Sequence, residues 1–279
     1  MIRTFGRTGS TLLMQILGTD KRVCFERLYP FEQRYLTYAY NMARMIGETP
    51  KANSTDWNND VLFQCRAASI GSLPYGRIKA FDREELARRC FVSLWEQFSQ
   101  AMREHQQLTP DQLAYYAEKV PNQVADHANK YLNARNIFLL RDPRDEMVSI
   151  RSFNQKRGFQ SFGWLDSDSD ISYARKICRN RRQFLQNLLS FDTSHRRIFV
   201  RYEDLIKNGE VEVARLSKWL GLPLSMKKAT RDKGIQKKHM TSENPGLSVE
   251  RWKTELSEEV LDIFRAEIGV ELKELGYTL

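Results

Sequence analysis

A short run near the start of the chain combines glycines, hydroxyl side chains and one arginine: Gly6-Arg7-Thr8-Gly9-Ser10-Thr11-Leu12. A glycine-containing turn between a strand and a helix presents backbone N–H groups at the helix N-terminus, where the helix dipole also favours an anion. Ser10 and Thr11 add hydroxyl donors, and Arg7 adds a charged fork. The run lacks the lysine of the ATP-type loop G-x-x-x-x-G-K-[ST], so it suits a phosphate or phosphosulfate better than ATP with magnesium. An ordinary capped turn is the alternative.

A second run, Arg141-Asp142-Pro143-Arg144-Asp145-Glu146-Met147-Val148-Ser149, follows a compact apolar stretch at residues 136–140. Ligands of parallel sheets bind at the carboxyl ends of the strands, so we expect Arg141 to emerge at a binding edge. Ser149 falls about two helical turns later and is expected to face the same edge. A guanidinium and a hydroxyl together suit a phosphate. The alternative is a capped helix with Arg–Asp pairs on its surface.

A third run, Phe199-Val200-Arg201-Tyr202-Glu203-Asp204-Leu205, includes the end of another apolar stretch at residues 197–201. An aromatic side chain at this edge, Tyr202, can lie against a nucleotide base. The carboxylates that follow can cap the next helix.

The elements that must position these runs follow from hydrophobic periodicity and turn residues. Expected strands cover residues 2–6, 136–140 and 197–201. Expected helices cover residues 10–17, 143–153, 172–189, 211–220 and 256–268. Residues 31–129 look mostly helical, with Leu86, Cys90, Leu94 and Phe98 at helical spacing and Thr109-Pro110 as a helix start. Residues 227–246 look like a loop. Strands that alternate with helices predict an α/β fold with a parallel sheet covered on both faces.

In this order, the three runs resemble the superfamily of sulfotransferases that use 3′-phosphoadenosine-5′-phosphosulfate (PAPS). The segment from Arg7 to Leu13 looks like their 5′-phosphosulfate loop, in the arginine-first form of bacterial and tyrosylprotein sulfotransferases. Arg141 and Ser149 match the residues that hold the 3′-phosphate. The resemblance implies a P-loop-like central parallel sheet, a mostly helical acceptor-side region at roughly 31–130, and one domain spanning residues 1–279. It also implies transfer without a metal.

Two further segments are similar to the family. Glu118-Lys119-Val120-Pro121 resembles a Lys-x-Pro element, and His239-Met240-Thr241-Ser242 with Glu250-Arg251-Trp252-Lys253 looks like a C-terminal segment that closes over the nucleotide. The chain departs from the family at Gly6, where proline is common. It also lacks an Arg-Lys-Gly element, whose charge could come from Arg231, Lys237 or Lys238.

The resemblance implies roles for individual residues. Backbone N–H groups of the loop, with Arg7, Ser10 and Thr11, would surround the phosphosulfate, and Lys119 would join them unless it is a plain surface lysine. The expected nucleotide contacts are Arg7, Thr8, Gly9, Ser10, Thr11, Leu12, Arg141, Ser149, Tyr202 and Arg251. Glu26 follows the apolar run Val23-Cys24-Phe25, a possible second strand, at nearly the offset of the general base in tyrosylprotein sulfotransferases. The alternative is that Glu26 pairs with Arg27 or Arg34.

Composition narrows the class of partner. The 279 residues carry a formal net charge of +9, which suits an anionic ligand, and no nucleic-acid recognition motif is visible. Four widely spaced cysteines without a Cys-x-x-Cys pair favour a reduced, cytoplasmic setting and argue against zinc. No apolar run approaches a membrane span, and no signal peptide is expected. The favoured function is sulfation of a small-molecule acceptor. A protein-tyrosine or glycan sulfotransferase, a P-loop small-molecule kinase and a non-catalytic nucleotide-binding protein are the alternatives.

Overall fold

The computed structural model describes residues 1–28, 31–47, 82–109, 111–231, 234, 241–242 and 244–279. The chain divides into two compact units, which we describe separately. The first comprises Met1, Lys21–Glu26 and Glu32–Ala134. The second comprises Ile2–Asp20, Arg27–Phe31 and Arg135–Leu279.

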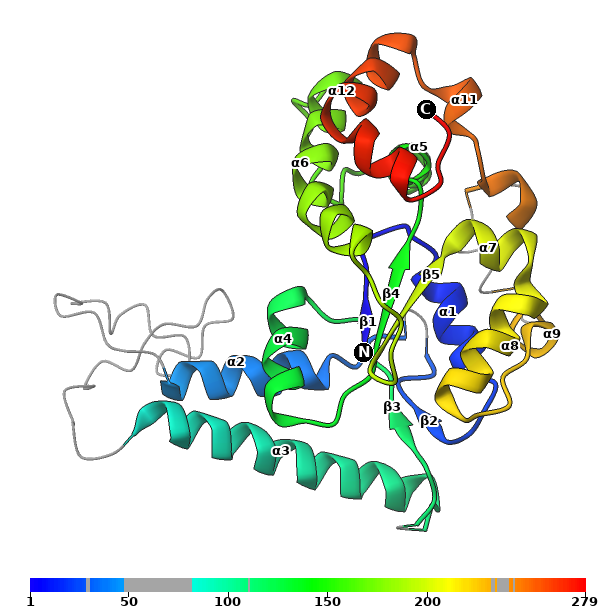
Figure 1. Ribbon diagram of the computed structural model, residues 1–279. Coiled ribbons are helices and arrows are strands. Elements are labelled where there is room, and N and C mark those ends of the chain that lie inside the picture. Colours follow the sequence, from blue (N-terminus) through cyan, green and yellow to red (C-terminus); the bar gives the residue numbers. More distant parts are fainter. Residues whose placement is uncertain (29–30, 48–81, 110, 232–233, 235–240, 243) are drawn as a thin grey trace, which may run out of the picture. The chain divides into compact units, whose positions relative to one another are not determined.

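A three-stranded parallel sheet forms the centre of the second unit (Figure 1). Its strands are β1 (Ile2–Arg3), β4 (Asn136–Leu140) and β5 (Arg197–Arg201), with β4 in the middle. Ile137 pairs with Ile2 on one side and with Ile198 on the other, and all three are buried. Such apolar strands are typical of a sheet covered by helices. The predicted parallel sheet is therefore confirmed, although β1 is shorter than the predicted strand at 2–6.

Helices flank this sheet and make up most of the rest of the second unit. They are α1 (Ser10–Leu17), α5 (Pro143–Arg157), α6 (Asp170–Leu189), α7 (Tyr202–Lys207), α8 (Gly209–Leu220), α9 (Met226–Ala229), α11 (Trp252–Glu255) and α12 (Glu258–Glu274), with a 3-10 turn, η2, at Pro245–Ser248. Helices α6 and α12 pack along each other and share a core with α5 (Figure 1). The mixed α/β fold expected from the sequence is thus confirmed.

Two details of the second unit differ from the sequence-based expectation. Helix α7 begins immediately after β5, where no separate helix was predicted. The expected loop at 227–246 overlaps α9 at its start and the first residues of η2 at its end. Residues 232–233, 235–240 and 243 within it lie outside the described residues.

The first unit combines a small parallel sheet with helices. Its strands are β2 (Val23–Cys24) and β3 (Tyr115–Tyr116), and its helices are α2 (Tyr35–Gly47), α3 (Arg83–His105) and α4 (Asn122–Tyr131). Helix α2 packs against both α3 and α4 around a core that includes Leu36, Phe91 and Val124.

The mostly helical character predicted for residues 31–129 holds for the described part of that range. The possible strand at Val23-Cys24-Phe25 is confirmed as β2, and its partner β3 was not predicted. The helix start predicted at Thr109-Pro110 is wrong. Pro110 lies outside the described residues, and the Gln112 N–H donates to the Thr109 carbonyl at 3.1 Å in a turn that leads to β3.

Candidate active site

The loop between β1 and α1 presents a helix N-terminus. Gly9 adopts a left-handed conformation with φ 91° at the N-cap, and the first helical hydrogen bond runs from Leu13 N–H to the Gly9 carbonyl at 3.1 Å. The N–H groups of residues 10–12 therefore have no acceptor within the helix, and the helix dipole places partial positive charge at this end. Thr8 points inward, because its hydroxyl donates to the Phe5 carbonyl at 2.9 Å. The loop has the backbone that an anion site requires.

A close contact with Tyr202 explains the glycine in this loop. A Cβ at position 9 would lie 2.2 Å from Tyr202 Cδ2, so only glycine fits beneath the ring. Tyr202 is the first residue of α7, and its hydroxyl shares a hydrogen bond of 2.8 Å with the Ser248 hydroxyl. The tyrosine expected to lie against a base thus packs directly on the loop.

Arg141 follows β4 directly and is buried. Its Nη1 donates to the Arg7 carbonyl at 2.9 Å, and its Nη2 donates to the Ser248 carbonyl at 2.5 Å. Its guanidinium lies over the Tyr202 ring, 4.8 Å from the centroid. Arg141 Nε, by contrast, has no hydrogen-bond partner among the described residues. Burial of a guanidinium N–H without a hydrogen-bond partner costs free energy. This N–H is therefore well placed to donate to an anionic ligand.

The side chain of Arg7 bridges the loop to helix α5. Its Nε donates to Ser149 Oγ at 3.2 Å, and its guanidinium lies over the Phe153 ring, 4.2 Å from the centroid. The residue itself has a left-handed backbone, with φ 65°. Arg7 and Ser149, 142 positions apart in the sequence, are therefore in direct contact. Sequence reasoning placed them at one site but did not foresee this contact.

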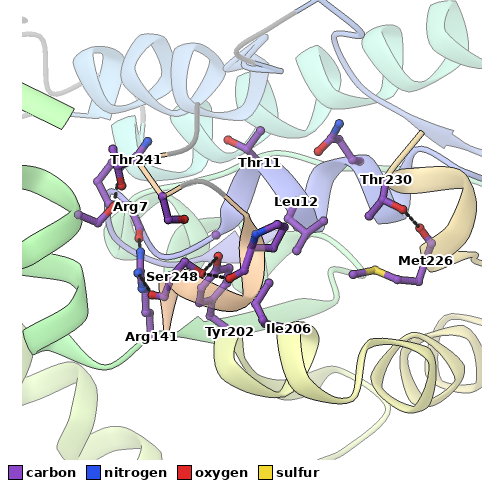
Figure 2. A pocket seen from close by; sticks show the side chains of 15 residues that line it. Arg7, Thr11, Leu12, Arg141, Tyr202, Ile206, Met226, Thr230, Thr241 and Ser248 are labelled. Carbon is purple, nitrogen blue, oxygen red and sulfur yellow. Dashed lines mark hydrogen bonds between the residues drawn. The ribbon is translucent and has the colours of Figure 1, made fainter. Parts of the chain in front are cut away.

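These residues border a cavity of about 100 Å³ (Figure 2). Figure 2 shows Arg7, Arg141, Thr241 and Ser248 grouped at a polar end of the cavity. Leu12, Ile206 and Met226 supply apolar surface away from that end. Ser149 and Gln15 also belong to the lining. Among the loop residues named as nucleotide contacts, Arg7, Gly9, Thr11 and Leu12 are in this lining, whereas Thr8 and Ser10 are not.

Several cavity residues carried no signal in the sequence. Ser248, Ile206 and Met226 belong to none of the three runs that suggested a binding site. Met226 begins α9 and Thr230 follows its last residue, and the Thr230 hydroxyl donates to the Met226 carbonyl at 3.1 Å. Only the tertiary fold brings these side chains to the Gly6–Leu12 loop.

The charged residues after Arg141 are buried, so the alternative of Arg–Asp pairs on a helix surface is wrong. Asp142 caps α5 by accepting from Arg144 N–H at 2.9 Å, and its carboxylate also accepts from the Arg144 side chain at 3.0 and 2.7 Å. The two residues are only 3% and 2% exposed. The Arg144 guanidinium lies 3.6 Å from the centroid of the Trp252 ring. These contacts fix the helix that carries Ser149.

Asp145 ties the C-terminal segment to the same helix. Its carboxylate accepts from the N–H groups of Trp252 at 3.0 Å and Glu250 at 2.6 Å. Burial raises the pKa of Asp145 to about 6, while the nearby Arg141 charge acts in the opposite direction. Ser248 lies only a few positions before Glu250 and Trp252. The hydrogen bonds to Asp145 therefore also hold the Ser248 carbonyl against Arg141.

Arg251 lies behind the cavity lining rather than in it. Its guanidinium donates to Glu255 at 2.7 and 3.1 Å, to Thr241 Oγ1 at 3.1 Å and to Ser152 Oγ at 3.0 Å. Ser152 stands one turn after Ser149 on α5, and Thr241 lines the cavity. Arg251 therefore supports the polar end through its neighbours. Of the basic residues considered for the missing element, Arg231 is exposed, and Lys237 and Lys238 lie outside the described residues, as does His239.

Lys119 and Glu26 belong to the first unit, so their distance from the loop stays a prediction. Lys119 is not a plain surface lysine: it is 15% exposed and its Nζ lies 2.7 Å from Glu32 Oε1. Burial acts to raise the pKa of Glu32, but hydrogen bonds from Lys119 and Arg34 outweigh it and hold that pKa below its ordinary value. Glu26 follows β2 and is partly exposed. Arg34, one partner considered for Glu26, pairs with Glu32 instead.

The described residues form neither a metal-binding cluster nor a membrane-spanning helix. No group of histidine, cysteine, aspartate and glutamate side chains in the described ranges is arranged to hold a metal ion. No helix in the part of the chain that the structure describes is long and apolar enough to cross a membrane.

Solved sulfotransferase structures share the fold of this chain. The sulfotransferase domain from the curacin biosynthetic pathway is 16% identical, with a TM-score of 0.53 over 100% of this chain and 97% of that one. The sulfotransferase domain from the Synechococcus PCC 7002 olefin synthase is 15% identical, with a TM-score of 0.52 over 100% and 94%. These likenesses show a shared fold. A search of curated proteins gave no match. A model of the sulfotransferase family matches residues 1–226, and this chain therefore belongs to the sulfotransferase family.

Proposed function

We propose that this protein transfers a sulfuryl group from PAPS to a hydroxyl or amine of a small-molecule acceptor, by in-line transfer without a metal. The observation that carries the proposal is the convergence of Arg7, Arg141 and Ser149 on one cavity beside the N-terminus of α1. Family membership supplies the sulfuryl-transfer chemistry. The two arginines and the serine suit a nucleotide that carries a second phosphate group.

The residues present fit PAPS at each of its three parts. The N–H groups of residues 10–12 suit the 5′-phosphosulfate. The unpartnered Nε of Arg141, with the Ser149 hydroxyl, suits the 3′-phosphate. The apolar end formed by Leu12, Ile206 and Met226 suits the adenine, because aliphatic and thioether groups pack well on an aromatic face. In this arrangement Arg251 supports the 3′ end through Thr241 and Ser152.

When bound, PAPS supplies the activated sulfuryl group, and the chain's own residues position it and stabilise charge. The N-terminus of α1 and the Thr11 hydroxyl would hold the 5′-phosphate and stabilise the negative charge that grows on it during transfer. Arg7, whose Nε donates to Ser149 Oγ, would add a full positive charge beside the bound nucleotide. We assign Glu26 as the base that accepts the acceptor's proton and Lys119, oriented by Glu32, as a second cation near the transferred group.

The alternatives are weaker for specific reasons. A kinase would need a lysine in the loop, and Gly6–Leu12 contains none. The two sulfotransferase domains compared above come from a biosynthetic pathway and an olefin synthase, which accords with a small-molecule acceptor more than with a protein-tyrosine or glycan acceptor. We place the protein in the cytoplasm, without a nucleic-acid partner. Measured turnover of any acceptor would exclude a purely nucleotide-binding role.

The proposal is tested by comparing two ligands, the desulfated product 3′-phosphoadenosine 5′-phosphate (PAP) and adenosine 5′-phosphosulfate, which lacks the 3′-phosphate. PAP should raise the melting temperature markedly, adenosine 5′-phosphosulfate much less, and ATP with magnesium not at all. Arg141→Ala should weaken PAP about tenfold or more, because a charge-assisted contact contributes roughly 1.5–3 kcal/mol. It should scarcely change the affinity for adenosine 5′-phosphosulfate.

Arg141 also holds the Arg7 and Ser248 carbonyls, so its loss alone can disturb the loop. Ser149→Ala is the matched variant, since it leaves those two contacts in place and removes only the hydroxyl that accepts from Arg7 Nε. A selective loss of PAP affinity in both variants supports the assignment. Equal losses for both ligands, in variants that melt like the wild type without ligand, would refute it.

A further inference from the structure

The chain beyond α12 turns back on itself in a Schellman motif. Gly276 is left-handed, with φ 81°, and its N–H donates to the Lys273 carbonyl at 3.0 Å. The Tyr277 N–H donates to the Leu272 carbonyl at 2.9 Å. This pair of hydrogen bonds ends many helices and needs a left-handed residue where Gly276 stands. The turn directs Tyr277 inward, so that Tyr277 and Leu272 are buried in one core.

Tyr277 lies against residues at the carboxyl edge of the central sheet. Its hydroxyl donates to Glu203 Oε2 at 3.1 Å, and the Arg201 guanidinium lies over its ring, 4.3 Å from the centroid. The Thr278 carbonyl accepts from Arg144 Nη2 at 2.5 Å. Tyr277 is not in the lining of the cavity beside α1. It therefore supports this edge from behind the proposed nucleotide site.

Glu203 joins Tyr277 to the peptide that follows Arg141. Its second carboxylate oxygen, Oε1, accepts from the Asp142 N–H at 2.8 Å, and both residues are buried. Burial raises the pKa of Glu203 above its ordinary value, whereas the hydrogen bond from the Asp142 N–H acts in the opposite direction. A buried carboxylate that loses a donor costs free energy. Loss of the Tyr277 hydroxyl should therefore displace Glu203, and with it the Arg141–Asp142 peptide.

We propose that Tyr277 is a positioning residue of the nucleotide site, which acts through Glu203 to fix Arg141 where its Nε meets the 3′-phosphate. Both terminal nitrogens of Arg141 already donate to carbonyls, so a shift of its backbone changes where Nε points. Tyr277 lies outside residues 1–226, which the family model matches. The inference rests on the proposed function and goes beyond it by giving a role to a residue that would not touch the nucleotide.

The test compares PAP with adenosine 5′-phosphosulfate by titration calorimetry of Tyr277→Phe, which removes only the hydroxyl. Residues that act through others change a binding constant by about 2- to 30-fold. We expect PAP affinity to fall about fivefold and the affinity for adenosine 5′-phosphosulfate scarcely to change, because only PAP carries the 3′-phosphate. A merely structural Tyr277 would lower the melting temperature and leave the ratio of the two affinities as in the wild type.

Tyr173→Phe is the matched control. Tyr173 is a buried tyrosine of the same unit, and its hydroxyl donates to the Phe162 carbonyl at 2.8 Å rather than to Glu203. This variant should keep the wild-type ratio of the two affinities. In the Arg141→Ala background, Tyr277→Phe should cause little further loss of PAP affinity, because its effect passes through Arg141. A full fivefold loss in that background would contradict the proposed route.

Two variants of Glu203 separate position from charge. Glu203→Gln keeps an oxygen for the Asp142 N–H and an amide that can donate to the Tyr277 hydroxyl, so the ratio should stay near that of the wild type. Glu203→Ala removes both contacts and should weaken PAP selectively, at least as much as Tyr277→Phe. A wild-type ratio in Tyr277→Phe, or equal selective losses in both Glu203 variants, would overturn the inference and leave the proposed function standing. Failure of the wild type to bind PAP would overturn both.

Discussion

At the scale of single residues, Glu26 carries the most specific prediction. Glu26→Gln keeps the size and polarity of the side chain but cannot accept a proton. If Glu26 is the base, turnover should fall by about 10²–10⁴, because a positioned base contributes that much. The PAP affinity should barely change. Steady-state rates with any turned-over acceptor, together with PAP titration, provide the measurement.

A structural role for Glu26 predicts the reverse pattern. The melting temperature of Glu26→Gln would fall, and turnover per folded molecule would stay near that of the wild type. Glu96→Gln, a change at an exposed position on α3 of the same unit, is the control and should alter neither quantity.

The residue types that line the cavity could be predicted from sequence, but their directions could not. Arg7 and Arg141 follow apolar runs, and Ser149 falls about two helical turns after Arg141, so all three were expected at one edge of the sheet. The sequence did not reveal that Arg7 reaches across to Ser149, because that depends on a left-handed backbone and on the Phe153 ring. Nor did it reveal that Asp142 and Arg144 are buried, since burial of a charge depends on partners supplied by distant segments such as Trp252.

At the scale of elements, two glycines with similar backbones should behave differently. Gly9 and Gly158 are both left-handed, with φ 91° and φ 74°. A Cβ at Gly158 meets nothing within 4 Å, whereas one at Gly9 meets the Tyr202 ring. Gly158→Ala should therefore cost about 1–2 kcal/mol of unfolding free energy for the backbone alone and leave PAP binding unchanged. Gly9→Ala should cost more and weaken PAP at least about tenfold, because the loop must move away from Tyr202.

Urea unfolding and PAP titration of both variants check this contrast. Equal PAP affinity in the two variants would mean that the Tyr202 contact does not set the loop geometry. A loss of stability in Gly158→Ala that matches the loss in Gly9→Ala would contradict the steric argument.

Elements with clear boundaries were predicted well. Helix α1 and strands β4 and β5 have the predicted bounds, because a charged or glycine residue ends each apolar run. Helix α7 was missed because it starts at the residue after β5, with no turn between the two. β3 was missed because two tyrosines are too short a pattern to show a period.

At the scale of the whole molecule, Asp145 should make stability depend on pH. Burial raises its pKa from the ordinary 3.8 to about 6 in the folded protein. The folded state therefore binds this proton more tightly than the unfolded chain does. The resulting stabilisation is fully present below about pH 4 and is lost as the pH rises through about 6. Asp145→Asn removes the titration, so the difference in unfolding free energy between wild type and variant should change by about 3 kcal/mol across this window.

Urea unfolding of both proteins at pH 4, 5, 6 and 7 measures that difference. The wild type should lose stability relative to Asp145→Asn as the pH rises. A difference that stays constant with pH would show that Asp145 does not titrate in this range.

The contacts around Arg141 also bear on when the cavity beside α1 forms during protein synthesis. Arg7 bonds Ser149 across 142 positions, and Arg141 bonds the Ser248 carbonyl across 107. A nascent chain that has left the ribosome only as far as α8 already carries the loop, Arg141 and Ser149, but not the segment that holds Arg141 in place. Contacts of such long sequence separation form late, because chain closure is entropically costly. The pocket therefore becomes complete only after Ser248 has been translated, so a chain truncated before Ser248 would contain the Gly6–Leu12 loop, Arg141 and Ser149 without the carbonyl that holds Arg141.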